Sequence, residues 1–179
     1  MTKIKICGLK REEDIDYANI LELDYIGFVF ANSKRQVTRG QASILKQRLH
    51  SSIKAVGVFV NENRDSVVEL LNDGIIDMAQ LHGDESEEDI LYIKENTNKK
   101  VIKAMQIGEY ENPGARIADV DTAADYILID SGKGSGKTFD WEILKDLGRP
   151  YFLAGGIGID NVEKAIDMLN PYGIDLSSK

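Results

Sequence analysis

The chain has 179 residues, of which 42% are hydrophobic and 29% charged, the balance of an ordinary soluble globular protein. Its net charge of -8 disfavours the nucleic-acid backbone and anionic membrane surfaces as partners. No apolar run reaches the length of a membrane span, and a strand that begins at Ile4 leaves no room for a signal peptide. With one cysteine, Cys7, the sequence predicts a cytoplasmic protein with a single domain over residues 1–179.

Eight short apolar runs, rich in Val, Ile, Leu and Phe, predict β-strands. Most are continuous rather than alternating, which is typical of strands that are covered on both faces. In chain order the runs are Ile4 to Cys7, Tyr25 to Phe30, Ala55 to Val60, Met78 to His82, Val101 to Gln106, Tyr126 to Ser131, Tyr151 to Gly155, and Gly173 to Ser177.

Amphipathic segments between these runs predict helices. Start signals are present at Asn63, at Asp84 and at the pair Asp160 and Asn161. The alternation of strands and helices implies a parallel sheet, and eight such strands most economically close into a (β/α)8 barrel, a TIM barrel. An open doubly wound sheet is the alternative, which the lack of a polar edge strand disfavours. The seven helices are expected to begin near Glu12, Gly40, Arg64, Ser86, Glu111, Asp140 and Asp160.

No helix is expected after the eighth strand, because the sequence stops at Lys179. A barrel of this class usually needs at least about 200 residues, so we expect a C-terminally truncated barrel without its eighth helix. Part of the apolar outer surface of the barrel would then face water or be covered by something else.

Two residues that can transfer a proton lie at the carboxyl ends of predicted strands, where barrels of this type place their active sites. Cys7 has no cysteine partner, and packing is the ordinary role of a free cysteine. Asp130 ends an apolar run, where desolvation would raise its pKa and keep it protonated, although anchoring a loop is the commonest role of Asp at a strand end. A thiolate Cys7 and a protonated Asp130 would form a base and acid pair that needs no metal or cofactor.

Other strand ends carry residues suited to anionic ligands. Arg35 can hold a carboxylate with two hydrogen bonds, whereas its neighbour Lys34 is typical of an exposed turn. Phosphate sites after the seventh and eighth strands are frequent in these barrels, which makes Gly155, Gly156, Ser177 and Ser178 candidates.

Three further features of the sequence bear on ligand binding. His82 is equally consistent with a ligand contact and with a hydrogen-bonded residue at a strand end. A metal site is not expected, because His50 is the only other histidine and no carboxylates cluster at ligand spacing. The segment 132–137 lacks the glycine spacing of a P-loop and is better interpreted as a mobile lid.

Ten stretches form a pattern that runs from end to end of the chain. They are Lys5-Ile6-Cys7-Gly8, Gly27-Phe28-Val29-Phe30, Ser33-Lys34-Arg35, Val56-Gly57-Val58-Phe59-Val60, Gln80-Leu81-His82-Gly83, Asp130-Ser131, Gly134-Ser135-Gly136-Lys137-Thr138-Phe139-Asp140-Trp141, Leu153-Ala154-Gly155-Gly156-Ile157, Asn161-Val162 and Asp175-Leu176-Ser177-Ser178. Taken in order, these stretches resemble the phosphoribosylanthranilate isomerase family of tryptophan biosynthesis.

The resemblance implies a cofactor-independent Amadori rearrangement of a phosphorylated small molecule, N-(5-phosphoribosyl)anthranilate, by a monomer or homodimer. Asp130 would be the general acid that opens the furanose ring, and Cys7 the general base that removes the C2′ proton. Arg35 would hold the anthranilate carboxylate, with the phosphate at the two glycine and serine pairs. The sequence departs from the family pattern at Lys133, where another glycine is usual, and after Ser178, where the family continues with a loop and a final helix.

Two other functions remain open at this point. A truncated barrel could bind a phosphate ligand or a partner chain without turnover, an alternative that the short C-terminus motivates. The chain could also be another phosphosugar isomerase that acts on an aminoaldose of histidine biosynthesis. Cys7 disfavours that alternative, because those enzymes resemble pairs of aspartates.

Overall fold

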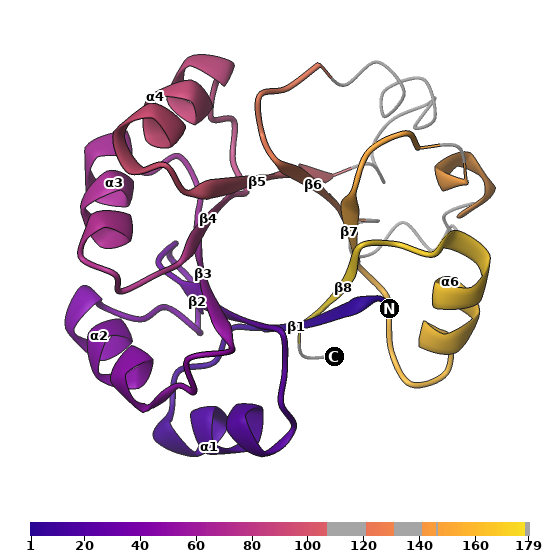
Figure 1. Ribbon diagram of the computed structural model, residues 1–179, viewed down its shortest axis with the longest axis horizontal. Helices are drawn as coiled ribbons and strands as arrows, with labels where there is room; N and C mark the ends of the chain where they lie inside the picture. Colours follow the sequence, from indigo (N-terminus) through magenta and orange to yellow (C-terminus); the bar gives the residue numbers. More distant parts are fainter. Residues whose placement is uncertain (107–120, 131–140, 146, 178–179) are drawn as a thin grey trace.

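Eight parallel strands close into a barrel in the part of the chain that the computed structural model describes, residues 1–106, 121–130, 141–145 and 147–177 (Figure 1). Each strand pairs with its neighbours in sequence, and the first strand pairs with both the second and the eighth. The helices lie around the outside of this ring (Figure 1). The predicted (β/α)8 architecture is therefore confirmed.

The strand bounds differ from the predicted ones by no more than one residue at either end. Apolar runs of this length, buried on both faces, leave little freedom in where a strand begins and ends. The strands are β1 (Lys3–Cys7), β2 (Tyr25–Val29), β3 (Lys54–Phe59), β4 (Met78–Leu81), β5 (Lys100–Gln106), β6 (Tyr126–Asp130), β7 (Tyr151–Ala154) and β8 (Gly173–Leu176).

Five α-helices and one short 3-10 helix are described. Thr38 and Ser86 form capping boxes with Gln41 and Asp89, and the side chain of Asn63 accepts a hydrogen bond from Asp65 N. The described helices are α1 (Glu12–Ile20), α2 (Arg39–Arg48), α3 (Arg64–Asn72), α4 (Glu87–Thr97), η1 (Trp141–Leu144) and α6 (Val162–Leu169).

Two helix predictions differ from the structure, and a third falls on residues that it does not describe. Asp84 does not start α4, because Ser86 holds the N-cap position and the reciprocal bonds. The helix expected near Asp140 is a single 3-10 turn, η1, among the described residues. The helix expected near Glu111 lies outside the described residues.

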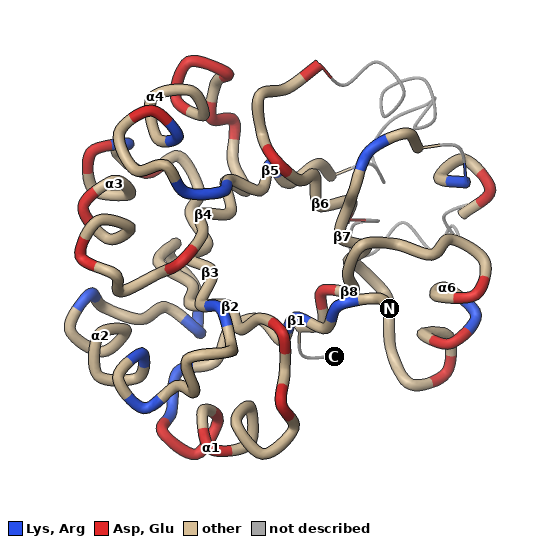
Figure 2. The backbone as a smooth tube through the Cα atoms, in the orientation of Figure 1, with Lys and Arg blue, Asp and Glu red and all other residues tan. Residues whose placement is uncertain are grey.

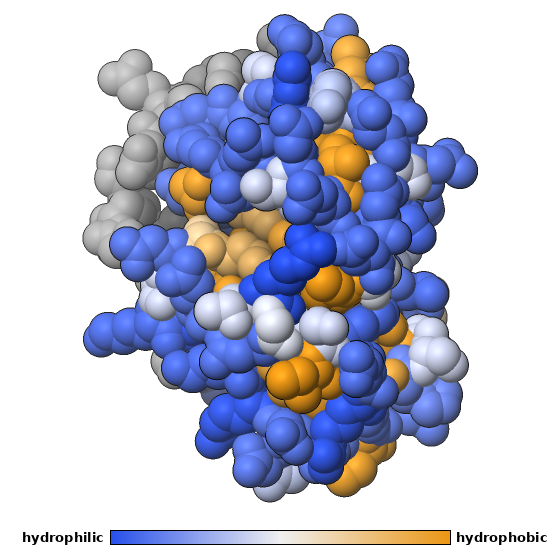
Figure 3. Space-filling view, turned by 90° about the vertical axis from the view of Figure 1, so that its left-hand side faces the viewer, coloured by the Kyte–Doolittle hydropathy of each residue, from blue (hydrophilic) through white to orange (hydrophobic). Residues whose placement is uncertain are grey.

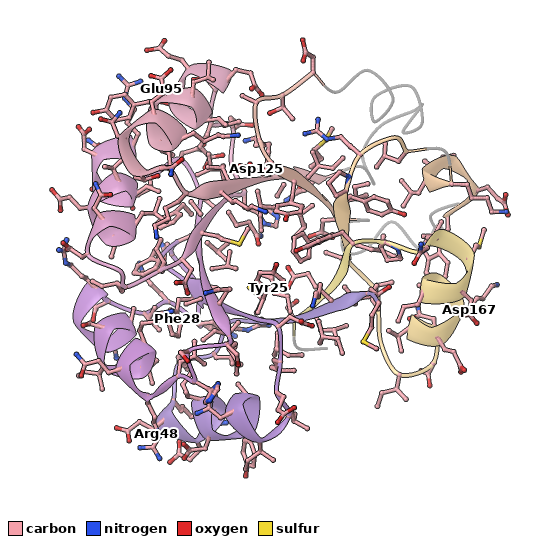
Figure 4. All side chains as sticks on the ribbon, viewed as in Figure 1. Tyr25, Phe28, Arg48, Glu95, Asp125 and Asp167 are labelled. Carbon is pink, nitrogen blue, oxygen red and sulfur yellow. The ribbon has the colours of Figure 1, made fainter. Side chains whose placement is uncertain are left out.

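Two apolar layers surround the strands. Side chains that point into the barrel form one core, with Tyr25, Leu128 and Phe152 among its members. Side chains that point outward pack under the helices, as Phe28 does against the α2 side (Figure 4). On the outer side of β1, Ile4 is exposed, so the apolar outer surface is partly in contact with solvent there.

The charged residues lie mostly on the helices and loops outside the ring (Figure 2). The face of the molecule drawn in Figure 3 is mostly hydrophilic with separate hydrophobic patches. No helix in the described part of the chain combines the length and the apolar character needed to cross a bilayer.

Candidate active site

Cys7 is the last residue of β1 and lies beside Gly27 of β2, its partner in the strand register. A β-carbon on Gly27 would lie 2.6 Å from the Cys7 Sγ atom, closer than real contacts allow. Glycine is therefore required at position 27 if the thiol is to keep its place. The thiol is half-buried at the carboxyl end of the barrel, where the sequence predicted a reactive group.

The Arg35 side chain lies directly against Gly8, the residue after Cys7. Gly8 has a φ of +89°, and a β-carbon there would lie 2.4 Å from Arg35 Cδ. Arg35 Nη1 also donates to the Cys7 carbonyl oxygen at 3.5 Å, and the Arg35 backbone N–H donates to Ser33 Oγ. These contacts bring the guanidinium next to the backbone of Cys7 and Gly8, although 28 residues separate Arg35 and Cys7 in sequence.

His82 follows β4 and lies between Gln80 and Asp130. Its Nδ1 atom is 3.0 Å from Gln80 Nε2, and its Nε2 atom is 3.9 Å from Asp130 Oδ2. Burial lowers the pKa of His82 below its ordinary value, against the opposing attraction of Asp130, so the ring is neutral at pH 7. Because an amide nitrogen only donates, Nδ1 accepts, and the ring proton lies on Nε2, toward Asp130.

A fully buried ion pair lies inside the barrel below Cys7. Lys5 Nζ is 2.9 Å from Asp175 Oδ1, with side chains that are 0% and 8% exposed. Lys5 and Asp175 are direct partners in the register between β1 and β8. Lys5 precedes Cys7 by two residues, so both side chains point to the same side of the strand.

The loop after β7 contains two consecutive glycines in the left-handed region. Gly155 has a φ of +76° and Gly156 a φ of +65°, a conformation that glycine adopts without steric cost. Asn161 closes this loop, since its Nδ2 donates to Gly156 O at 3.0 Å and its Oδ1 accepts from Gly158 N. Ser177 follows β8 and is exposed, whereas Ser178 and the segment 132–137 lie outside the described residues.

No group of three or more His, Cys, Asp or Glu side chains in the described ranges has an arrangement that could hold a metal ion. The chemistry that the described site can perform is proton transfer. Its candidates are Cys7, His82 and Asp130, with Lys5 and Asp175 beneath them.

The model of the family described as N-(5'phosphoribosyl)anthranilate (PRA) isomerase matches residues 4–179. The chain belongs to the phosphoribosylanthranilate isomerase family. A relative from Endomicrobium trichonymphae, named N-(5'-phosphoribosyl)anthranilate isomerase, is 46% identical over 183 residues, which cover 99% of this chain and 88% of that protein. A relative of the same name from Thermoanaerobacter sp. (strain X514) is 44% identical over 188 residues, with the same coverage.

Solved structures of phosphoribosylanthranilate isomerases have the same fold. The enzyme from Thermotoga maritima superposes with a TM-score of 0.85 at 33% identity, covering 99% of this chain and 88% of that one. A phosphoribosylanthranilate isomerase in complex with reduced 1-(o-carboxyphenylamino)-1-deoxyribulose 5-phosphate superposes with a TM-score of 0.83 at 32% identity and the same coverage. A third structure, of monomers generated from the dimeric Thermotoga maritima enzyme, has a TM-score of 0.80 at 30% identity, covering 99% of this chain and 87% of that one.

The structure brings together several residues that the sequence singled out. Cys7 and Arg35 are in contact through the backbone, and His82 faces Asp130. The glycine pair lies at the end of a different strand, β7, after Ala154, and Ser177 lies at the end of β8.

Three residues of this site stand in stretches that carry the family resemblance but were given no role from the sequence: Lys5, Asp175 and Gln80. The available signal was a charged or polar residue inside an apolar strand, in each case two residues before a strand-end candidate. Because β1 and β8 are neighbours in a closed barrel, the opposite charges of Lys5 and Asp175 also indicated a pair.

Proposed function

We propose that the chain is a phosphoribosylanthranilate isomerase of tryptophan biosynthesis. It converts N-(5'-phosphoribosyl)anthranilate into 1-(2-carboxyphenylamino)-1-deoxyribulose 5-phosphate. The observation that carries this proposal is the family match over residues 4–179. It is supported by the half-buried thiol at the end of β1 and by the similar structure that holds a reduced form of the product.

Asp130 acts as the general acid in the first step. It donates its proton to the furanose ring oxygen while the bond between that oxygen and C1′ breaks. The lone pair of the anthranilate nitrogen forms the C1′–N double bond of a protonated Schiff base. The place of Asp130 at the carboxyl end of β6, facing His82, supports this role.

Cys7 acts as the general base in the second step. Its thiolate takes the C2′ proton, and the released electron pair forms a C1′–C2′ double bond while the nitrogen becomes neutral. The resulting enolamine tautomerises to the ketone, with loss of the hydroxyl proton and protonation of C1′. No atom is gained or lost, C1′ is reduced and C2′ oxidised, which makes the reaction an aldose–ketose isomerisation.

Substrate binding is assigned to groups around this pair. Arg35 binds the anthranilate carboxylate through two parallel hydrogen bonds, and its contact with Gly8 supports this assignment. The backbone at Gly155 and Gly156 binds the phosphate, together with Ser177 and with Ser178, which lies outside the described residues. His82 contacts the substrate through its Nε2–H group.

We further propose that the reaction needs no cofactor, since proton transfers between side chains and substrate account for every step. The protein is expected to act in the cytoplasm as a monomer or homodimer. The alternative function, a barrel that binds phosphorylated ligands without turnover, predicts ligand binding but no loss of substrate.

The test is an assay of the purified chain with N-(5'-phosphoribosyl)anthranilate, in which the loss of substrate fluorescence is followed. Circular dichroism and a cooperative unfolding transition first establish that the protein is folded. We expect decay of the fluorescence in proportion to enzyme concentration. Binding of the reduced product by a folded protein that shows no turnover would contradict the proposal and support the binding-only alternative.

A further inference from the structure

The buried ion pair of Lys5 and Asp175 carries a desolvation penalty in the interior of a small barrel. Removing two charges from water opposes folding, and a pair of apolar side chains often stabilises a protein as well or better. The other described positions inside the barrel are largely apolar, including Val56, Ile102 and Leu128. The position of the Lys5–Asp175 pair inside the barrel, directly below the Cys7 thiol, indicates a role beyond packing.

Lys5 and Cys7 share one face of β1, and no residue of that face separates them. Lys5 is fully buried, and its ammonium lies 2.9 Å from Asp175 Oδ1 on the neighbouring strand β8. Burial acts to lower the pKa of Lys5, but attraction to Asp175 and to Cys7 outweighs it and raises the pKa above its usual value. The side chain is therefore a permanent cation at neutral pH.

The charges that act on Cys7 come from several elements of the barrel. Lys5 on β1 and Arg35 in the loop after β2 are positive. Burial raises the pKa of the Asp175 carboxyl on β8, and the Lys5 ammonium at 2.9 Å opposes that rise and favours the carboxylate. Burial raises the pKa of the Cys7 thiol, and the Lys5 ammonium opposes that effect more strongly than the Asp175 carboxylate reinforces it. His82, after β4, is neutral at pH 7, and Asp130 on β6 faces it.

We propose that Lys5 is a positioning residue that stabilises the thiolate form of Cys7, and that Asp175 holds Lys5 charged and directed at the thiol. This inference rests on the proposed role of Cys7 as the general base. Burial leaves the pKa of the Cys7 thiol above its usual value overall, so the thiolate is the minor form at neutral pH. It forms when the thiol loses its proton to solvent, and the neighbouring ammonium increases its population. The thiolate then takes the C2′ proton, and the S–H bond forms as the C2′–H bond breaks.

The test uses the fact that Cys7 is the only cysteine of the chain, so its alkylation by iodoacetamide reports on one group. The rate is measured from pH 6 to 10 in the wild type and in Lys5→Met, with Cys7→Ser as background. We expect the rate of Lys5→Met at pH 8 to fall about tenfold, the effect of one pKa unit at a pH below both pKa values. Lys5→Arg, which keeps the positive charge, is expected to restore most of the rate.

The matched control is Lys3→Met, the same substitution two residues earlier on β1. Lys3 forms a pair with Asp24 at 2.7 Å, but its side chain is 43% exposed at the other end of the strand. We expect Cys7 in Lys3→Met to be alkylated at the wild-type rate over the whole pH range. A fall in the alkylation rate of Lys3→Met equal to that of Lys5→Met would contradict a specific role of Lys5.

Lys5→Met leaves Asp175 buried without its partner, which can prevent folding. In that case Lys5→Met combined with Asp175→Leu replaces the pair by apolar side chains of similar size. Because the Lys5 ammonium affects the pKa of the thiol more strongly than the Asp175 carboxylate does, Cys7 of this variant is also expected to be alkylated more slowly at pH 8. An unchanged pH profile in a folded variant of either kind would overturn the inference.

Turnover separates this inference from the proposed function. We expect Lys5→Met to lower kcat in parallel with the alkylation rate while KM changes little. If Cys7→Ser retains full turnover, the role of Cys7 as base fails, whatever the alkylation shows. If Cys7→Ser is inactive and Cys7 of Lys5→Met is alkylated at the wild-type rate, only the role of Lys5 fails.

Discussion

Gly27 and Cys7 are so close across β1 and β2 that the sulfur occupies the space a side chain at position 27 would need. The distance from an added β-carbon would be 2.6 Å to Sγ and 3.0 Å to the Cys7 Cα atom. Because backbone as well as side-chain atoms are in the way, rotation of the thiol alone does not relieve the contact.

We therefore expect Gly27→Ala to displace Cys7 and to lower both stability and turnover. Overpacking of this kind costs about 1–3 kcal/mol, which urea unfolding measures directly. Gly40→Ala is the matched control, since a β-carbon at Gly40 of α2 meets no atom within 4 Å and alanine favours the helix. Equal unfolding free energies of the Gly27→Ala and Gly40→Ala variants would contradict the packing described for Cys7.

Arg35→Lys tests the assignment of the guanidinium to the anthranilate carboxylate. Lysine keeps the positive charge but loses the planar pair of donors, so the substrate is bound less tightly in ground and transition states alike. Steady-state kinetics should show a KM about tenfold higher with kcat little changed, the pattern of lost uniform binding. Lys34→Gln, at the exposed neighbouring position, should leave both constants unchanged; an unaltered KM in Arg35→Lys would remove Arg35 from the carboxylate site.

Gln80 should fix the tautomer of His82, because its Nε2 atom lies 3.0 Å from Nδ1 and only donates. Nitrogen-15 NMR at pH 7.5 is expected to show the proton on Nε2 in the wild type. In Gln80→Leu this hydrogen bond is absent, and the Nδ1–H tautomer should become populated. His50 serves as the internal reference, since it contacts Ser52 at the surface instead. An Nδ1–H signal for His82 in the wild type would contradict this account.

The lowered pKa of His82 should also appear in the pH dependence of stability. Burial keeps the ring neutral in the folded chain, so the unfolded chain takes up a proton at a higher pH than the folded chain. Stability is therefore expected to fall as the pH drops through the ordinary histidine value, about 6.5, until the pKa of the folded state is reached. His82→Asn should lose less unfolding free energy than the wild type between pH 7.5 and 5.5. Equal losses in the two proteins would mean that His82 does not titrate as described.

The strands were predictable from the sequence because apolar runs such as Tyr126 to Ile129 are long enough for a strand and too short for a helix. The proton-transfer candidates followed from their places at the ends of those runs. The contact between Lys5 and Asp175 was harder to predict, since 170 residues separate them and only closure of the barrel makes β1 and β8 neighbours.

Two details of the loop before α4 differ from what the sequence predicted, because neighbouring residues compete to cap this helix. Ser86 caps α4 in place of Asp84, because Asp89 stands three residues later and completes a capping box. The backbone N–H of Asp84 instead donates to Asn61 Oδ1, which ties the loop after β4 to the loop after β3. Sequence spacing alone did not reveal that interaction.

Turnover by Cys7→Ser tests most directly whether Cys7 removes the C2′ proton. Loss of a general base lowers the rate by about 10²–10⁴-fold. We expect kcat/KM for N-(5'-phosphoribosyl)anthranilate to fall by that range in Cys7→Ser, with KM and the urea unfolding transition close to those of the wild type. A variant with wild-type turnover, or one whose lost activity follows from lost stability alone, would contradict the account and return Cys7 to a role in packing.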